Sequence, residues 1–289
     1  MKQLDLTPLK EAKEKGKFLK IGTVATLNNA LNQIYNTMGS KLEEYHLFYR
    51  GHADSDFESV PSIYRRKPDS DGLYIDSEDR FCSSILRECP TDFDAKMTAF
   101  DMLVKMQHYD LPTRLLDITE NPLVALYFAS LEPITKGNNG SILIYFIHKD
   151  DVVNFNTLEV GLLSSISFLP ANLLKKAKTT QKLNQLLNTM RLYSDQLPYI
   201  KGVEDLDKTL CVLPRKANPR IMRQQGAFFL FGIQDGDKSR ISSLDIEPFE
   251  LEVLNTGRKE ILSQLERYAI SEKYLFPEID HVAHYIKTH

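Results

Sequence analysis

The sequence predicts an α+β fold, with a small mixed or antiparallel sheet flanked by several helices and a helical C-terminal end. Three observations support this prediction. Apolar residues recur at helical spacing in several segments, and short runs rich in β-branched and aromatic residues stand between them. Proline or glycine marks most of the boundaries. Because there is no repeat, low-complexity linker or charge block, a single domain is expected rather than two independent ones.

The first quarter of the chain predicts one helix, one strand and a long connection. Residues 1–20 are lysine-rich and weakly apolar, which is typical of an arm or a loosely docked start. Residues 23–38 predict an amphipathic helix that Thr23 can cap. Residues 46–50 are aromatic and predict a buried strand ended by Gly51. Residues 52–74 predict an irregular connection, and loops of that length are more often functional than accidental.

The next segments predict three helices around a polar loop. Acidic residues in the first turn favour a helix over residues 76–88, which Pro90 ends. Residues 93–108 predict a second, largely buried helix. A loop or short strand is expected next, and the pair Asn121-Pro122 then begins a helix to residue 131, because proline is tolerated in the first helical turn.

The second half predicts the remaining strands and the terminal helices. Residues 136–140 predict a hairpin-like turn that leads into a central strand at residues 141–147. A polar amphipathic helix is expected at residues 171–191. Further strands are expected at residues 209–213, 226–233 and 249–253, and terminal helices at residues 258–268 and 281–287, separated by Pro277.

The composition is that of an ordinary globular protein. The 289 residues, 42% hydrophobic and 26% charged, suffice for one or two domains. A net charge of −3 and a pI near 6.2 favour neither nucleic acid nor an anionic membrane globally, although a local basic groove is allowed. Three cysteines without Cys-x-x-Cys spacing favour a reducing compartment. Since no signal peptide or membrane-spanning run is found, a cytoplasmic protein with no membrane contact is expected.

The segment of residues 107–122 is the densest in chemistry. Its sixteen residues hold imidazole, guanidinium, carboxylate, amide and hydroxyl groups together with two prolines, and an apolar run follows it. Polar groups beside a buried helix are costly unless they pair with each other or with a ligand. His108 could act as an acid–base group or be a core histidine bonded to a carbonyl. Arg114 and Asp117 could bind a ligand or form a structural pair, which would be costly to break.

Two other segments carry candidate residues. Arg50 ends a strand beside Gly51 and His52, where a planar guanidinium suits phosphate or carboxylate, although a structural salt bridge to Asp54 is the alternative. The segment of residues 219–226 offers arginine and amide donors before a glycine and an apolar strand. It predicts either the lip of a pocket or a β-turn with solvated arginines.

Metal and classical cofactor motifs are not found. Four residues that could converge show no ligand spacing of a known metal site: His46, His52, His108 and Asp117. Glu278, His281 and His284 predict a solvated helix face. The sequence has no Gly-x-Ser-x-Gly elbow, Walker loop or Rossmann glycine pattern, so no metal is expected and no cofactor is certain.

Three segments together resemble the FRG domain family, named for a Phe-Arg-Gly motif and found mainly in bacteria and their mobile elements. They are Phe48-Tyr49-Arg50-Gly51, residues 107–122 with Ala125-Leu-Tyr-Phe-Ala129, and Arg220 with Gln224-Gln225-Gly226-Ala227-Phe228. This chain departs from the family with Tyr49 in the motif, Asp110 where glycine is usual and Ile118 where tryptophan is usual. The resemblance covers roughly residues 30–235, and Leu275–Asp280 looks like the family's tail.

The resemblance implies one FRG-type domain over residues 1–289. Its core is expected at about residues 30–150, completed by strands within residues 205–255, with C-terminal helices in residues 256–289.

The order of elements is also similar to ADP-ribosyltransferases of the Arg–Ser–Glu kind. This weaker resemblance places Arg50 at the dinucleotide-binding arginine, Thr113 or Thr119 near the serine, and Arg220 near the catalytic glutamate. A guanidinium has the wrong sign to replace a carboxylate that steadies an oxocarbenium ion. The chain therefore either binds a nucleotide without transferring it or uses another acid, for which Asp117 is the candidate.

The first hypothesis is therefore a cytoplasmic FRG-domain protein with a pocket for NAD or a related nucleotide, acting in bacterial stress or anti-phage defence. Such a pocket implies an ADP-ribosyl or glycosyl transferase or an NAD glycohydrolase, if the protein is an enzyme. The candidate catalytic residues are His108 and Asp117. The candidate ligand-binding residues are Arg50, Gly51, His52, Gln107, Tyr109, Thr113, Arg114, Thr119, Asn121, Arg220, Gln224 and Gln225.

Two other hypotheses stand beside it. The second is a nucleic-acid-binding or nucleic-acid-processing protein, because aromatic residues interleave with arginine at residues 45–50 and 64–66. It would use Arg50, Arg65, Arg66, Arg220 and Arg223 on phosphates. The third is a non-enzymatic sensor or interaction module, whose protein partner the sequence does not identify.

Overall fold

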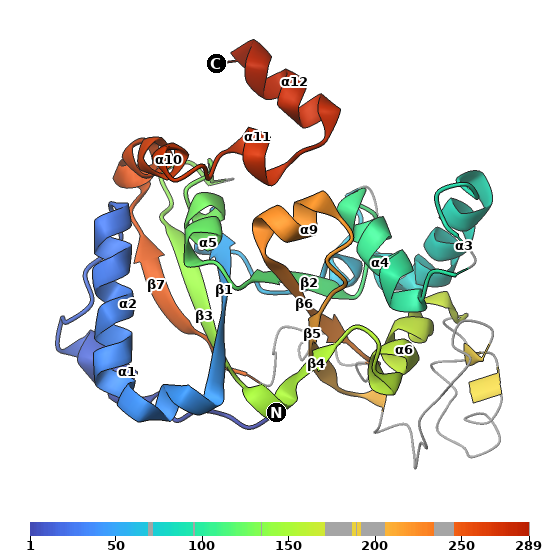
Figure 1. Ribbon diagram of the computed structural model, residues 1–289, viewed down its shortest axis with the longest axis horizontal. Coiled ribbons are helices and arrows are strands. Elements are labelled where there is room, and N and C mark those ends of the chain that lie inside the picture. Colours follow the sequence, from blue (N-terminus) through green and yellow to red (C-terminus); the bar gives the residue numbers. More distant parts are fainter. Residues whose placement is uncertain are drawn as a thin grey trace.

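A seven-stranded mixed sheet lies at the centre of the molecule (Figure 1). The computed structural model describes residues 1–68, 72–94, 96–133, 135–170, 187–188, 190–191, 206–233 and 246–288. The strands are β1 (Tyr45–His52), β2 (Leu115–Thr119), β3 (Gly140–His148), β4 (Val152–Asn154), β5 (Thr209–Leu213), β6 (Gly226–Phe231) and β7 (Phe249–Val253). Their order across the sheet is β4-β5-β6-β2-β1-β3-β7. Neighbouring strands are antiparallel except for the parallel pair β4 and β5.

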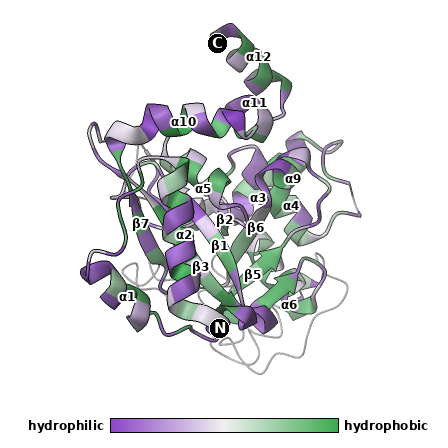
Figure 2. Cartoon of the chain, turned by 60° about the vertical axis from the view of Figure 1, so that its left-hand side comes forward, coloured by the Kyte–Doolittle hydropathy of each residue, from purple (hydrophilic) through white to green (hydrophobic). Residues whose placement is uncertain are grey.

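Helices surround this sheet, so the predicted α+β class is confirmed. In the described part of the chain they are α1 (Thr7–Glu14), α2 (Val24–Met38), α3 (Glu78–Glu88), α4 (Ala99–His108), α5 (Pro122–Ala129), α6 (Leu158–Ser165), α9 (Pro219–Gln224), α10 (Arg258–Arg267), α11 (Glu272–Leu275) and α12 (Ile279–Thr288). In Figure 2 strands β5 and β6 are mainly hydrophobic and the outer helix α10 is mainly hydrophilic, as expected for a sheet buried beneath amphipathic helices.

The sheet is split between β1 and β2. Strand β1 pairs with β3 along its whole length, and β2 pairs with β6 along its whole length. Between β1 and β2 only Tyr49 and Thr119 are register partners. The two halves of the sheet are therefore joined at one position and diverge from it.

The hydrophobic core follows this division. On one face, one cluster packs α2, α5 and α10 against β1, β3 and β7. On the same face, a second cluster packs α4 and α6 against β2, β5 and β6. A third cluster covers the opposite face and includes Ile63 and Tyr64 from the long connection together with Phe48 and Phe229 of the sheet. The first two clusters therefore meet at the boundary between β1 and β2.

Most predicted elements are present, with differences at their ends. The helix capped by Thr23 is confirmed as α2, with the Thr23 hydroxyl accepting from the Thr26 amide at 3.1 Å. The helix expected from residue 93 begins only at Ala99, because Thr98 and Asp101 form a reciprocal capping box there. The turn expected to be a hairpin at residues 136–140 instead connects α5 to β3.

Several elements were not predicted, and one prediction is not tested. The elements β4, α6, α9 and α11 are short or carry weak periodicity, and the sequence does not predict them. The helix expected at residues 171–191 falls outside the described residues except at residues 187, 188, 190 and 191.

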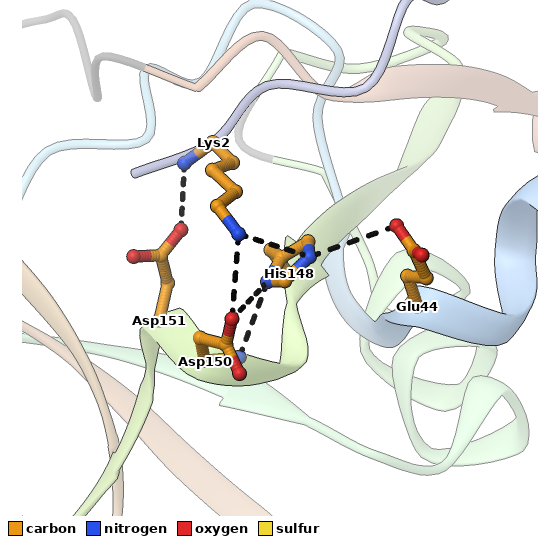
Figure 3. Close-up of polar contacts among 5 residues, drawn as sticks. All are labelled: Lys2, Glu44, His148, Asp150 and Asp151. Carbon is orange, nitrogen blue, oxygen red and sulfur yellow. Dashed lines mark hydrogen bonds and ion pairs between the residues drawn. The ribbon is translucent and has the colours of Figure 1, made fainter.

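The N-terminal residues are docked rather than forming a loose arm. Helix α1 buries Leu9 completely against the cluster of α2 and β7. Ahead of it, the Lys2 backbone amide donates to Asp151 at 2.6 Å, and the Lys2 ammonium lies 3.3 Å from Asp150 and 3.5 Å from His148 (Figure 3). The expectation for residues 1–20 was wrong because their few apolar side chains are sufficient to anchor a short helix.

None of the helices in the described ranges has the length and apolar character needed to cross a bilayer.

Candidate functional site

A cavity of about 360 Å³ opens where β1 and β2 diverge, bordered also by α4, α5 and α9. This volume lies at the lower end of the range of about 300–1,000 Å³ typical of small-molecule sites. The predicted site residues that line it are Arg50, Gly51, Gln107, His108, Asp117, Thr119, Arg220 and Gln224. The split in the sheet thus brings together side chains from all three sequence segments singled out above.

Arg50 bridges the split. Its Nη1 donates to the backbone carbonyl of Asp117 on β2, and its Nε donates to the His52 Nε2 at 3.0 Å. The alternative, a structural salt bridge to a nearby acid such as Asp54, is not found among the described residues. The Asp54 carboxylate instead accepts from Asn138 and from the backbone amides of Thr135 and Asp56. Burial lowers the pKa of Arg50, and the nearby Asp117 opposes that shift.

His52 supports Arg50 from behind. Its side chain is buried, with 4% exposed, and it does not line the cavity. Burial, and then the charge of Arg50, lower the pKa of His52 to about 3. The neutral imidazole can therefore accept from Arg50, and His52 acts on the cavity only through that arginine.

Gly51 is required by a helix rather than by a turn. The strand continues through Gly51 to His52. A Cβ atom at Gly51 would lie 1.9 Å from the Ala125 carbonyl oxygen of α5, which is far inside contact distance. The glycine therefore allows α5 to pack directly on β1 at the edge of the cavity.

A chain of hydrogen bonds holds the Asp117 carboxylate. The Thr113 hydroxyl donates to the Gln107 Oε1 at 2.5 Å, and the Gln107 Nε2 donates to the Asp117 Oδ2 at 2.9 Å. The Leu115 amide donates to the Thr113 oxygen at 3.1 Å, which fixes that hydroxyl as a donor toward Gln107. Thr113 is buried and does not line the cavity, so it orients Gln107 rather than touching a ligand.

Arg114 is structural and its partner is Glu78. Its Nε lies 2.7 Å and its Nη2 2.6 Å from the Glu78 carboxylate, and its Nη1 donates to the Gly232 carbonyl at 2.6 Å. Burial alone would lower the pKa of Arg114, but Glu78 more than offsets this and the pKa is raised. The possible pair with Asp117 is therefore wrong, and the expected contact of Arg114 with a ligand phosphate is not supported because the guanidinium lies outside the cavity.

His108 meets the C-terminal part of the chain at the rim of the cavity. Its Nε2 is paired with the Glu278 Oε1, and the two side chains are 13% and 24% exposed. The prediction that Glu278 lies on a solvated helix face is therefore wrong. His281 pairs with Glu272 at 3.6 Å. The side chain of His284 lies outside the described residues.

The segment of residues 219–226 contains helix α9, not a β-turn with solvated arginines. The Asn218 side chain caps the helix by accepting from the Arg220 amide at 2.8 Å. The Arg220 guanidinium lies 4.5 Å from the centre of the Phe276 ring. Gln225 ends the helix in the left-handed conformation, with φ of 46°, and does not line the cavity.

Of the remaining predicted residues, Thr119 lines the cavity, whereas Asn121 and Tyr109 do not. The Thr119 hydroxyl donates to the Gln224 carbonyl at 2.6 Å, tying β2 to α9. Asn121 caps α5 by accepting from the Leu123 amide at 2.9 Å, and lies outside the cavity lining. Tyr109 is 62% exposed and packs edge-on against the His108 ring.

Sequence reasoning missed several lining residues. They include Tyr49, Ser62, Arg65, Asp110, Phe128 and Asn218. The sequence marks Arg65 only as a phosphate contact in the nucleic-acid hypothesis. The long irregular connection before α3 was the available signal for Ser62 and Arg65. Phe128 belongs to the Ala125–Ala129 run of the family resemblance, but the apolar character of that run predicts only a buried helix.

The charges in the cavity are unevenly compensated. Three arginines, Arg50, Arg65 and Arg220, line it and form no ion pair with an acidic side chain of the described residues. Asp117 supplies a carboxylate on the other side of the split. No group of three or more histidine, cysteine, aspartate or glutamate side chains in the described part of the chain is placed to hold a metal ion. The cavity is suited to an anionic ligand that also presents donors to Asp117.

The fold and this cavity define an α+β protein with a polar pocket at a split in its sheet. Residues 45–137 match the family model of the FRG domain, so the chain carries an FRG domain, as the sequence resemblance implied. The matched residues include Arg50, Gln107, His108 and Asp117, whereas α9 and the C-terminal helices lie beyond them. Comparisons with curated proteins and with solved structures each found no match.

Proposed function

We propose that the cavity between β1 and β2 binds a nucleotide, NAD or a related one, in a manner similar to ADP-ribosyltransferases. Arg50 supports the phosphate-binding part of this proposal. Its guanidinium lines the cavity, is held on two sides by His52 and the Asp117 carbonyl, and has no acidic partner among the described residues. A preorganised guanidinium of this kind suits a phosphate group.

The single observation that carries the proposal is the placement of Arg50 and Asp117 on opposite sides of the split. The arginine provides positive charge for a diphosphate, and the carboxylate provides negative charge for a ribose that becomes cationic. Among the described residues, only Gln107 donates a hydrogen bond to the Asp117 carboxylate, through Oδ2. The second oxygen, Oδ1, therefore remains available for a ribose hydroxyl.

The proposed reaction is cleavage of the bond between the ribose C1′ and the nicotinamide nitrogen. The bonding electron pair leaves with nicotinamide, which departs as a neutral molecule, and positive charge develops on the ribose ring. Asp117 stabilises that charge electrostatically. A water molecule or an acceptor hydroxyl then forms the new bond to C1′ and gives its proton to a base, a role proposed for His108 at the cavity rim.

The proposed cellular role is bacterial stress or anti-phage defence in the cytoplasm. It rests on the family resemblance, because FRG domains occur mainly in bacteria and their mobile elements. The product distinguishes three activities. Transfer yields a modified acceptor, hydrolysis yields free ADP-ribose, and binding alone releases no nicotinamide.

Titration with NAD tests the proposal. The native protein is expected to bind NAD, and Arg50→Ala is expected to weaken binding by at least about tenfold, since a charge-assisted contact contributes about 1.5–3 kcal/mol. Arg66→Ala is the matched control, because Arg66 is exposed and does not line the cavity. The Arg66→Ala variant is expected to bind NAD with the affinity of the native protein.

Nicotinamide release from NAD, measured on the same proteins, then separates catalysis from binding. Release that is lost in Asp117→Asn with binding retained supports the reaction. Failure of the native protein to bind NAD up to millimolar concentration overturns the proposal.

A further inference from the structure

The C-terminal segment of residues 272–278 contacts side chains at the rim of the cavity. We infer that Glu278 and Phe276 are positioning residues of the site, the first for His108 and the second for Arg220. This inference rests on the proposed function. It adds two residues that lie far outside the 45–137 range of the FRG match and far in sequence from the groups on which they act.

The pair of Glu278 and His108 fixes the imidazole. Glu278 contacts Nε2 through Oε1, and both side chains are mostly buried. A carboxylate accepts hydrogen bonds only, so a neutral imidazole must place its proton on Nε2 and leave Nδ1 as the basic nitrogen. A carboxylate in this position orients a histidine base and stabilises the imidazolium that forms when the base takes up a proton.

The second carboxylate oxygen of Glu278 makes no hydrogen bond with the described residues. This atom, Oε2, is also buried. An unsatisfied buried carboxylate oxygen is unfavourable for stability and calls for an explanation. The orientation of His108 provides that explanation, because His108 is the only described side chain with which Glu278 makes a polar contact.

Phe276 acts in the same way on Arg220. The centre of its ring lies 4.5 Å from the Arg220 guanidinium and 6.1 Å from the centre of the Phe128 ring, to which it stands edge-to-face. Arg220 and Phe128 both line the cavity, from α9 and α5 respectively. Phe276 therefore sets the position of a cavity cation from a residue that does not itself line the cavity.

The segment is anchored independently of these two side chains. Leu275 is fully buried, and its carbonyl accepts from the Gln224 side chain at 3.1 Å. The Tyr274 carbonyl accepts from Arg223 at 3.1 Å. Helix α11 accordingly lies beside α9 (Figure 1). Substitutions at Phe276 and Glu278 should therefore leave the segment docked, so that their effects on the site can be measured.

The first test uses the free protein and needs no ligand. The nitrogen NMR shifts of the His108 ring are compared in the native protein, Glu278→Ala and Glu278→Gln. The native ring is expected to be a single Nε2–H tautomer, which Glu278→Ala loses and Glu278→Gln retains through its amide oxygen. Glu272→Ala is the matched control, since Glu272 lies in the same segment but contacts His281, so the His108 ring should not change.

The second test measures NAD turnover and affinity. Glu278→Ala is expected to lower kcat for nicotinamide release at least about tenfold with KM nearly unchanged, and Glu278→Gln to recover the part due to orientation. Phe276→Leu is expected to weaken NAD binding about threefold to tenfold, as for loss of a cation–π contact, and Phe276→Tyr to restore it.

The outcomes separate the two proposals. If the native protein does not bind NAD, the proposed function fails, and the His108 spectra still decide the role of Glu278. If the His108 tautomer is the same in the native protein and in Glu278→Ala, the inference for Glu278 is overturned even where NAD binds. If Phe276→Leu binds NAD as tightly as the native protein, the inference for Phe276 is overturned.

Discussion

Arg50 and His52 lie two residues apart on β1, and the arginine Nε donates a hydrogen bond of 3.0 Å to the histidine Nε2. The histidine can accept only while that nitrogen carries no proton. A protonated His52 would lose the bond and place a second buried cation beside Arg50. The conformation of the cavity arginine is therefore coupled to the protonation of a buried histidine.

The stability of the protein is expected to fall between pH 6.5 and pH 3 because of His52. Its pKa is about 3 in the folded protein, lowered from 6.5 by burial and by Arg50, so the unfolded chain binds more protons in this window. The stabilising contribution is complete above pH 6.5 and is lost as the pH falls toward 3. Its full size is on the order of 2–5 kcal/mol. Urea unfolding at a series of pH values measures it.

His52→Gln is the control for this pH dependence. Glutamine stays neutral and can accept from Arg50 through its amide oxygen, so the slope between pH 6.5 and pH 4 should decrease. Asp54 does not interfere in this window. Hydrogen bonds led by Asn138 lower its pKa from 3.8 to about 2, so its contribution is lost only as the pH falls further. Equal slopes for the native protein and His52→Gln would contradict the assignment.

The buried pair of Arg114 and Glu78 is expected to be essential for stability. Glu78→Gln leaves the guanidinium without its charge partner in a site where both side chains are at most 5% exposed. The expected loss is about 3–5 kcal/mol in the free energy of unfolding. Denaturant unfolding measures it, with Lys10→Met as the control. That substitution breaks an exposed pair with Glu247 and should change stability by less than about 1 kcal/mol.

The chemistry of residues 107–122 was predictable, but the direction of each side chain was not. The residue types and the two prolines indicated a site, and the structure places Gln107, His108 and Asp117 around one cavity. Arg114 is only three residues from Asp117, yet it turns away because α3 supplies Glu78, a long-range partner that no local pattern reveals. The local signal identified the segment, and tertiary packing decided which side chains face the cavity.

Local sequence patterns also predicted only part of the fold. Strong periodicity and capping residues predicted α2, α5 and β3 well, because local preferences and burial agree there. The order of the strands, and the split between β1 and β2 that forms the cavity, depend on pairings between distant segments. Glu278 illustrates the consequence. Its neighbours at helical spacing suggested a solvated face, and its contact with His108 spans 170 residues of sequence.

Gly51→Ala is expected to destabilise the protein and disturb the cavity. The added Cβ would meet the Ala125 carbonyl at 1.9 Å, and backbone on both sides must move to relieve the clash. A loss of about 1–3 kcal/mol is expected, as for overpacking of a core. Gly226→Ala is the matched control, because its nearest contact would be an ordinary 3.8 Å from Ile221. Thermal unfolding of both variants should show a large shift for Gly51 only, and similar shifts would argue against the close approach of α5.

Thr113 is expected to affect catalysis without touching the ligand. Its hydroxyl holds the Gln107 amide at 2.5 Å, and that amide holds the Asp117 carboxylate at 2.9 Å. Thr113→Val removes the donor, so Gln107 can rotate and Asp117 loses its fixed orientation toward the ribose. Nicotinamide release should fall at least about tenfold while NAD affinity, set mainly by Arg50, changes little.

Thr113→Ser distinguishes this orienting role from a packing role. Serine keeps the hydroxyl but lacks the methyl group, so it should restore nicotinamide release even if it lowers the melting temperature. Valine keeps the shape and lacks the hydroxyl, so it should lower release even where stability is retained. If release instead follows stability across the two variants, Thr113 contributes packing alone. The orientation of Asp117 would then depend on Gln107 without help from the buried threonine.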